Sequence, residues 1–170
     1  MSYEPTLRPW QLTDVASLAR QANNSNIWNN LRDYFPHPYT KNDGEQFIRM
    51  VLDKTAPAVD FAIVVEGKAV GGIGIVPNKD VERISAEMGY WLGEEYWGQG
   101  IMTRVVRQMY EYVFAGFPII KLYAPVFSHN PASIRVLEKA GFVREGILRQ
   151  AAIKNGKVID LHYYGLVKPQ

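Results

Sequence analysis

The spacing of apolar residues predicts two helices in the first third of the chain. A short strand over residues 3–8 comes first. Thr13 and Asp14 then offer an N-cap, and apolar side chains recur at helical spacing over residues 15–22. Residues 47–52 show the inner face of a second helix.

Alternating apolar positions predict strands in the middle of the chain. Residues 59–65 and 69–76, joined by a turn centred on Gly67, have the pattern of a β-hairpin. Residues 84–92 are expected to form the next strand. The longest helix follows over residues 99–115, because apolar residues recur on one of its faces.

A short apolar strand is expected over residues 119–126, and a short helix follows it over residues 130–140. Asn130 is a favourable N-cap residue, and Pro131 suits the first helical position because that position needs no N–H donor. This part of the chain therefore predicts a strand followed by a capped helix.

The order of these elements predicts the fold class. The early strands form an antiparallel meander, and residues 84–126 form a strand–helix–strand unit. Residues 142–148 and 158–167 add a final hairpin. We expect one α/β domain over residues 1–170, with a mixed sheet of about seven strands and about four flanking helices.

Composition narrows the class of protein. The 170 residues, 47% apolar and 21% charged, fit one globular domain with a packed core. A net charge of +2 without a cluster of Lys or Arg argues against nucleic acid as a partner. The chain has no cysteine, which excludes disulfides and a cysteine nucleophile, and its three histidines lack metal-ligand spacing.

The N-terminal residues lack the pattern of a signal peptide. No apolar run approaches the ~20 residues that span a bilayer. A cytoplasmic protein without a membrane partner is therefore expected.

The clearest chemical signal is the segment EYWGQG at residues 95–100, between a predicted strand and the longest helix. Two glycines there let the backbone approach a ligand closely. The N–H groups of the first helical turn and the helix dipole favour an anion, which predicts a pyrophosphate site. A simple tight turn is the alternative. Dinucleotide and P-loop sites fit less well, because Thr103 replaces the third glycine and the P-loop lysine is absent.

Four segments carry a family resemblance: EMGYWL at residues 87–92, YWGQG at residues 96–100, NPAS at residues 130–133 and EKAGF at residues 138–142. In this order they resemble the GNAT superfamily of N-acetyltransferases, and most of all its branch of RimJ and RimL ribosomal-protein N-terminal acetyltransferases. The resemblance implies a splayed sheet whose fourth and fifth strands part to admit acetyl-CoA as the acyl donor, without a metal.

The resemblance also implies which residues bind the cofactor. The fourth strand would pair with the pantetheine arm, the glycine loop would hold the pyrophosphate, and an asparagine would contact the cofactor arm. These residues are Met88, Gly89, Tyr90, Trp97, Gly98, Gln99, Gly100, Ile101, Met102, Thr103 and Asn130. Two positions depart from the family pattern. Glu95 replaces a common Arg or Gln and is expected to face away from the phosphates, and Leu137 replaces the tyrosine acid of many relatives.

Amide formation needs a base for the amine and an acid for the departing thiolate. Glu87, beside the splay on an otherwise apolar strand, is the candidate base, directly or through water; a solvent-facing or ion-paired glutamate is the alternative. Ser133 is the candidate acid, because it matches a serine with this role in some relatives; helix capping is the alternative. Tyr163 and Tyr164 on the last strand are alternative donors.

The acceptor is expected at residues 23–39, an Asn-rich segment closed by two prolines, because connections of this length are often functional. In the resembling branch the acceptor enters between the first two helices and the last hairpin. Arg32 and Asp33 would bind its charged groups, unless they pair with each other. Tyr34 and Phe35 would line an apolar wall, unless Phe35 plugs the core. The substrate-binding candidates are Arg32, Asp33, Tyr34, Phe35 and Tyr163.

These features predict an enzyme that transfers an acetyl group from acetyl-CoA to a primary amine by direct attack in a ternary complex. The amine would be a protein N-terminus, a polyamine, an amino acid or a related small amine. A non-catalytic acyl-CoA-binding or sensing module on the same fold is the alternative, because the usual tyrosine acid is missing. The acceptor's identity, and whether the protein is a monomer or a homodimer, stay open.

Overall fold

The computed structural model describes residues 3–54 and 57–169, and over these it contains seven strands and five α-helices. Hydrogen bonds join the strands in the order β1-β2-β3-β4-β5-β7-β6. The strands are β1 (Thr6–Arg8), β2 (Asp60–Val65), β3 (Lys68–Pro77), β4 (Ser85–Leu92), β5 (Lys121–Phe127), β6 (Val143–Lys154) and β7 (Lys157–Val167). The helices are α1 (Val15–Ala22), α2 (Ser25–Trp28), α3 (Lys41–Leu52), α4 (Ile101–Gly116) and α5 (Pro131–Lys139).

The sheet is mixed, as predicted. β1 pairs antiparallel with β2, and β2 with β3. β4 and β5, which the long helix α4 connects along the chain, pair in parallel. β7 pairs antiparallel with both β5 and β6. The α/β class read from the order of elements is therefore confirmed.

The chain divides into two compact units. The first contains the residues up to Gly74 together with Tyr90–Ile101, and the second contains Ile75–Gly89 and the residues from Met102 onward. β3 and β4 each contribute residues to both units. A single acetyltransferase domain over residues 1–170, a range that extends beyond the described residues, stays a prediction.

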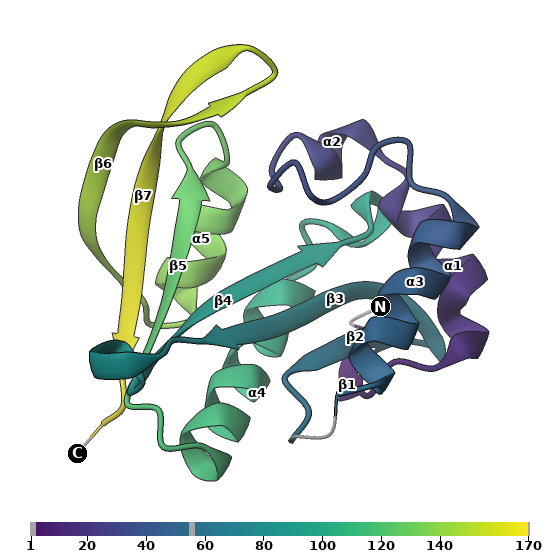
Figure 1. Cartoon of the computed structure of the whole chain (residues 1–170), viewed down its shortest axis with the longest axis horizontal. Coiled ribbons are helices and arrows are strands. Elements are labelled where there is room, and N and C mark those ends of the chain that lie inside the picture. The colour runs from purple at the N-terminus through teal and green to yellow at the C-terminus, as the bar shows by residue number, and fades with distance from the viewer. Residues whose placement is uncertain (1–2, 55–56, 170) are drawn as a thin grey trace. The chain divides into compact units, whose positions relative to one another are not determined.

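In the first unit, α1 and α3 lie side by side (Figure 1). Their apolar faces bury Leu18 and Ile48 completely or almost completely, and each such side chain contributes about 1.5–3 kcal/mol. Helix α3 begins earlier than its apolar spacing predicted, because Thr40 and Asp43 form a capping box. The Asp43 carboxylate accepts from the Thr40 N–H at 2.7 Å, and Thr40 Oγ1 accepts from the Asp43 N–H at 3.2 Å.

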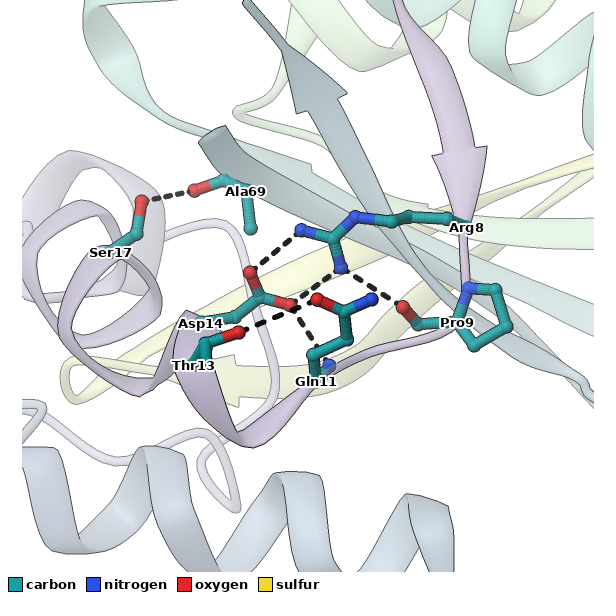
Figure 2. A network of polar contacts seen from close by, with 7 residues as sticks. All are labelled: Arg8, Pro9, Gln11, Thr13, Asp14, Ser17 and Ala69. Carbon is teal, nitrogen blue, oxygen red and sulfur yellow. Dashed lines mark hydrogen bonds and ion pairs between the residues drawn. The ribbon is translucent and has the colours of Figure 1, made fainter. Parts of the chain in front are cut away.

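A polar network joins β1 to the start of α1 (Figure 2). The Arg8 guanidinium donates to both oxygens of Asp14, at 2.7 and 2.8 Å. The Gln11 N–H donates to Asp14 Oδ2 at 2.9 Å. Burial of Asp14 favours its neutral form, but the hydrogen bonds from Arg8 and Gln11 outweigh burial and lower the pKa of the carboxyl. Asp14 therefore remains charged inside the first unit.

Helix α2 is the element that apolar spacing did not predict, because a single helical turn shows no period. It lies within residues 23–39, for which the sequence predicted no helix or strand. Asn24 is its N-cap, and Asn24 Oδ1 accepts from the N–H groups of Asn26 and Ile27 at 2.8 and 3.4 Å. The richness in asparagine therefore has a structural cause at this turn.

In the second unit, β6 and β7 form the long final hairpin, and β7 also pairs with β5 (Figure 1). β6 extends to Lys154, six residues further than predicted, because its pairing with β7 continues to the hairpin turn. α4 buries the predicted apolar face, namely Met102, Val105, Val106, Met109 and Val113.

Candidate functional site

The glycine loop, residues 93–100, connects β4 to α4. The Gly93 N–H donates to the Val70 carbonyl at 2.8 Å, which fixes the start of the loop to β3. A 3₁₀ turn, η3 (Glu94–Tyr96), follows. The Trp97 indole Nε1 then donates to the Leu92 carbonyl at 2.7 Å. The loop is therefore folded back on the end of β4 before α4 begins.

Gly98 and Gly100 adopt left-handed backbone conformations, with φ of 74° and 70°. A Cβ at either position would meet no other atom within 4 Å. The glycines are thus required by backbone conformation, and the space beside them is open to a ligand. Open peptide groups that lead into the first turn of the 16-residue helix α4 fit a phosphate-bearing group.

The two acidic residues at the start of the loop are held by the segment that contains α1 and α2. The Glu95 carboxylate accepts from Gln21 Nε2 at 2.5 Å and from the Arg20 guanidinium at 3.3 Å. The Glu94 carboxylate accepts from Asn24 and Asn26. The Glu95 side chain is therefore directed onto α1, and its expected orientation away from the phosphates stays a prediction.

Glu87 lies in the second unit, at the point where strand pairing ends. β4 and β5 pair over Ser85–Glu87 and Lys121–Tyr123, although β4 continues to Leu92 and β5 to Phe127. Beyond Glu87, Met88 is buried and Gly89 is exposed. A Cβ at Gly89 would meet no other atom within 4 Å. The backbone of this part of β4 is therefore accessible at Gly89.

Tyr123 is a functional candidate that sequence reasoning missed. It is the register partner of Glu87, and its ring stacks on Tyr163 with centroids 6.0 Å apart. The Tyr123 hydroxyl donates to Asn78 Oδ1 at 3.2 Å. The structure thus brings Tyr163 beside the strand position that pairs with Glu87. In the sequence, the apolar residues Leu122, Ala124 and Val126 recur at every second position, and this alternation is the signal that would have placed Tyr123 on the opposite face of the strand.

Asn130 and Ser133 meet at the start of α5. Asn130 Oδ1 accepts from the Ser133 N–H at 3.2 Å, so Asn130 is the N-cap that the sequence predicted. Ser133 therefore takes part in the helix cap through its backbone N–H, which donates to Asn130. The role of its hydroxyl as an acid stays a prediction.

Tyr164 is directed to α5. Its hydroxyl donates to Glu138 Oε1 at 3.0 Å, and its side chain is buried. Burial and the hydrogen bond to Glu138 raise the pKa of Tyr164. A hydroxyl engaged in this way is a poor proton donor for a substrate.

Four of the predicted acceptor residues, Arg32 to Phe35, lie in the first unit and differ in exposure. Phe35 is half-buried and packs on Tyr39 and Trp91, with ring centroids 5.0 and 5.8 Å apart, so it plugs the core as the alternative held. Tyr34 is 85% exposed. Arg32 and Asp33 also lie at the surface.

Asn30 lies within the predicted acceptor segment, although sequence reasoning did not single it out. Its Nδ2 donates to the Asn26 carbonyl at 2.9 Å, which fixes the orientation of the amide. Its Oδ1 is buried and accepts no hydrogen bond from the described residues. A buried carbonyl oxygen is normally satisfied, so Asn30 presents an acceptor suited to an N–H donor. The lack of any periodic signal explains why the sequence did not reveal it.

Neither a metal-ion cluster nor a membrane-spanning helix is found in the part of the chain that the structure describes. Over residues 3–54 and 57–169, no group of three or more His, Cys, Asp or Glu side chains is placed to hold a metal ion. No helix in this part of the chain combines the length and the apolar character needed to cross a bilayer.

Residues 6–143 match the family model described as the acetyltransferase (GNAT) domain. The chain is 39% identical over 101 residues to the uncharacterized N-acetyltransferase YoaA of Bacillus subtilis, and the match covers 59% of this chain and 56% of YoaA. Less than two thirds of that relative is therefore spanned. The chain is 30% identical over 136 residues to the uncharacterized N-acetyltransferase p20 of Bacillus licheniformis, a match that covers 77% of this chain and 76% of p20.

Ribosomal-protein acetyltransferases are also among the relatives. The ribosomal-protein-serine acetyltransferase of Escherichia coli is 29% identical over 118 residues, which cover 69% of this chain and 65% of that protein. The structure of RimJ from Mycobacterium smegmatis, in complex with CoA-disulfide, matches with a TM-score of 0.84 over 96% of this chain and 81% of RimJ, at 21% identity. This likeness shows the shared fold. The resemblance read from the sequence is confirmed: the chain belongs to the GNAT family of acetyltransferases.

Proposed function

We propose that this protein is an acetyl-CoA-dependent N-acetyltransferase that acts on a primary amine. The observation that carries the proposal is the glycine loop, where two left-handed glycines have open space at their Cβ positions and lead into α4. That arrangement suits a backbone cradle for a pyrophosphate. Family membership supports acetyl-CoA as the molecule that carries it.

Acetyl-CoA supplies the acetyl group as an activated thioester. The backbone N–H groups from Trp97 to Thr103 would hold its pyrophosphate, because they belong to the loop and the first turn of α4. The exposed backbone around Gly89 would pair with the pantetheine arm. Asn130 would contact the same arm through its Nδ2, since its Oδ1 already caps α5.

Two side chains of the second unit would move protons. The Glu87 carboxylate would take a proton from the acceptor ammonium or amine, directly or through water. The Ser133 hydroxyl would donate its proton toward the departing sulfur. Ser133 matches a serine with this role in some relatives, and Glu87 lies where the pairing of β4 with β5 ends.

The acceptor is proposed to be a primary amine of a protein N-terminus, a polyamine, an amino acid or a related compound. Arg32, Asp33 and Tyr34 are exposed residues that could contact it, and Tyr163 presents an aromatic ring beside Tyr123. Asn30 adds a buried hydrogen-bond acceptor for an amine N–H. Location in the cytoplasm, and a monomeric or homodimeric state, stay predictions.

The test is the release of thiol from acetyl-CoA, followed colorimetrically against pools of amines and short peptides. The chain has no cysteine and contributes no background thiol. Amine-dependent release is the expected result. Calorimetry with acetyl-CoA is run in parallel. Binding without release from any pool would favour the non-catalytic acyl-CoA-binding module, and the absence of binding would overturn the proposal.

A further inference from the structure

The carboxylate of Glu94, the first residue of η3, accepts hydrogen bonds from two side-chain amides at the start of α2. Asn24 Nδ2 donates to Glu94 Oε2 at 2.6 Å. Asn26 Nδ2 donates to Glu94 Oε1 at 2.9 Å. Each carboxylate oxygen therefore has its own donor, and a charged acceptor makes both hydrogen bonds stronger than neutral ones.

The two asparagines are themselves fixed. Asn24 Oδ1 caps α2 by accepting from the Asn26 and Ile27 N–H groups, so Asn24 Nδ2 must face Glu94. The Asn26 carbonyl accepts from Asn30 Nδ2. A continuous chain of hydrogen bonds thus runs from Glu94 through Asn26 to Asn30. It links the glycine loop to the segment that carries the candidate acceptor residues.

Glu94 also supports the loop through its backbone. Its carbonyl accepts from the Trp97 N–H at 3.1 Å, which closes the turn directly before Gly98. The side chain of Glu94 therefore binds the α2 region, while its backbone carbonyl holds Trp97, the first residue of the proposed pyrophosphate cradle. Through its side chain and its backbone, Glu94 therefore connects the glycine loop to the α2 region.

A carboxylate at this place needs a reason, because a negative charge near a pyrophosphate opposes binding. We propose that Glu94 is a positioning residue, which fixes the glycine loop to α2 so that cofactor binding at the loop also orders the Asn24–Asn30 segment. The inference rests on the proposed function, since it takes coenzyme A as the ligand of the loop. It concerns Glu94, Asn24 and Asn26, to which family resemblance assigns no role.

The direction in which Glu94→Gln changes the affinity for coenzyme A distinguishes a positioning role from a simple charge effect. If Glu94 were only a nearby charge, its removal would tighten coenzyme A binding. If Glu94 positions the loop, binding weakens, because the new NH₂ group faces an asparagine NH₂ and one hydrogen bond is lost. We expect the dissociation constant of coenzyme A, measured by calorimetry, to rise about tenfold.

Glu45→Gln is the matched control. Glu45 is also exposed, lies in the same unit on α3, and accepts two hydrogen bonds from Arg49 at 2.9 and 2.7 Å. Its replacement removes the same charge without touching the loop, so coenzyme A affinity should not change. Both variants should have melting temperatures close to that of the wild type.

Adding Asn26→Asp to Glu94→Gln tests the pairing itself. The new carboxylate would accept from the new amide, which restores the hydrogen bond with donor and acceptor exchanged. Affinity for coenzyme A should return to within about twofold of the wild type if the two residues act as a pair. A double variant no better than Glu94→Gln would contradict the pairing.

Hydrogen exchange gives a readout that is independent of activity. Coenzyme A should slow amide exchange over residues 24–31 in the wild type and in Glu45→Gln, but not in Glu94→Gln. Failure of the wild type to bind coenzyme A would overturn the proposed function together with this inference. Normal binding by the wild type with unchanged or tighter binding by Glu94→Gln would overturn the positioning role alone.

Discussion

Glu87 and Tyr123 are register partners at the last position where β4 and β5 pair in parallel. The Tyr123 ring stacks on Tyr163, and its hydroxyl is held by Asn78. A carboxylate and two aromatic rings are thus contributed by neighbouring strands of the second unit. Aromatic faces and carboxylates both attract ammonium groups, so this arrangement suits an amine before and during its deprotonation.

Glu87→Gln should lower kcat/KM for the acceptor by about 10²–10⁴-fold, the usual contribution of a general base. The affinity for acetyl-CoA should not change, because the carboxylate acts on the amine. Steady-state kinetics and calorimetry measure the two effects. Glu82→Gln is the control, since Glu82 is an exposed residue of the same unit. Wild-type turnover in Glu87→Gln would remove Glu87 from the mechanism.

Ser133→Ala should reduce kcat while leaving the structure of α5 intact. The cap uses the Ser133 N–H, which alanine retains, and so the helix loses no capping hydrogen bond. We expect a loss of about tenfold or more in kcat if the hydroxyl protonates the leaving thiolate. An unchanged kcat would reject Ser133 as the acid.

Two substitutions separate the roles of Asn130. Asn130→Ala removes the cap and should lower the free energy of unfolding by about 1 kcal/mol. Asn130→Asp keeps an oxygen that caps α5 but loses the amide donor. We expect both variants to bind coenzyme A more weakly in calorimetry, and only Asn130→Ala to be less stable in urea. Normal coenzyme A affinity in Asn130→Asp would show that Asn130 is a cap alone.

Gly98→Ala and Gly100→Ala should each cost about 1–2 kcal/mol of stability, because alanine resists the left-handed conformation. They should also raise the dissociation constant of coenzyme A, since the loop must shift. Gly67→Ala is a matched control: Gly67 has a φ of 78° and open space around its Cβ position, in the hairpin between β2 and β3. Gly67→Ala should lose similar stability, while its affinity for coenzyme A stays that of the wild type. Wild-type affinity in Gly98→Ala and Gly100→Ala as well would argue against a pyrophosphate cradle.

The Arg8–Asp14 pair predicts a pH dependence of stability. The pKa of Asp14 is lower in the folded protein than in the unfolded chain, so the pair stabilises the fold above the unfolded pKa. This contribution is lost as the pH falls through the folded pKa, so urea midpoints should drop as the pH is lowered past the unfolded pKa of about 3.9. Asp14→Asn should be less stable by about 2–3 kcal/mol at pH 7, since Arg8 loses its buried partner.

Asp14→Asn should also lose less further stability on acidification than the wild type. The surface pair of Arg49 and Glu45 provides a contrast, because both side chains are about half exposed. Its removal by Glu45→Gln should cost less than about 1 kcal/mol. Identical pH profiles for the wild type and Asp14→Asn would contradict a charged Asp14 in the folded state.

Most of the fold was predictable because its signals are local. The apolar face of α4, the Asn130 cap of α5 and the glycine turn between β2 and β3 each depend on residues within a few positions of one another. Helix α2 escaped prediction, since one turn has no period and depends on its cap at Asn24. The full length of β6 escaped as well, because its pairing with β7 is irregular between Leu148 and Ala152, so that no simple alternation continues past Leu148.

By itself, the sequence determined the order of elements, the glycine loop and the acetyltransferase family, because steric preferences of glycine, capping and apolar periodicity act over short stretches of chain. Only the tertiary structure decided which groups meet across long separations. The grip of Asn24 on Glu94, the end of strand pairing at Glu87 and Tyr123, and the unpaired oxygen of Asn30 follow from packing and strand register. The first two join residues far apart in the chain, and no local pattern specifies any of the three.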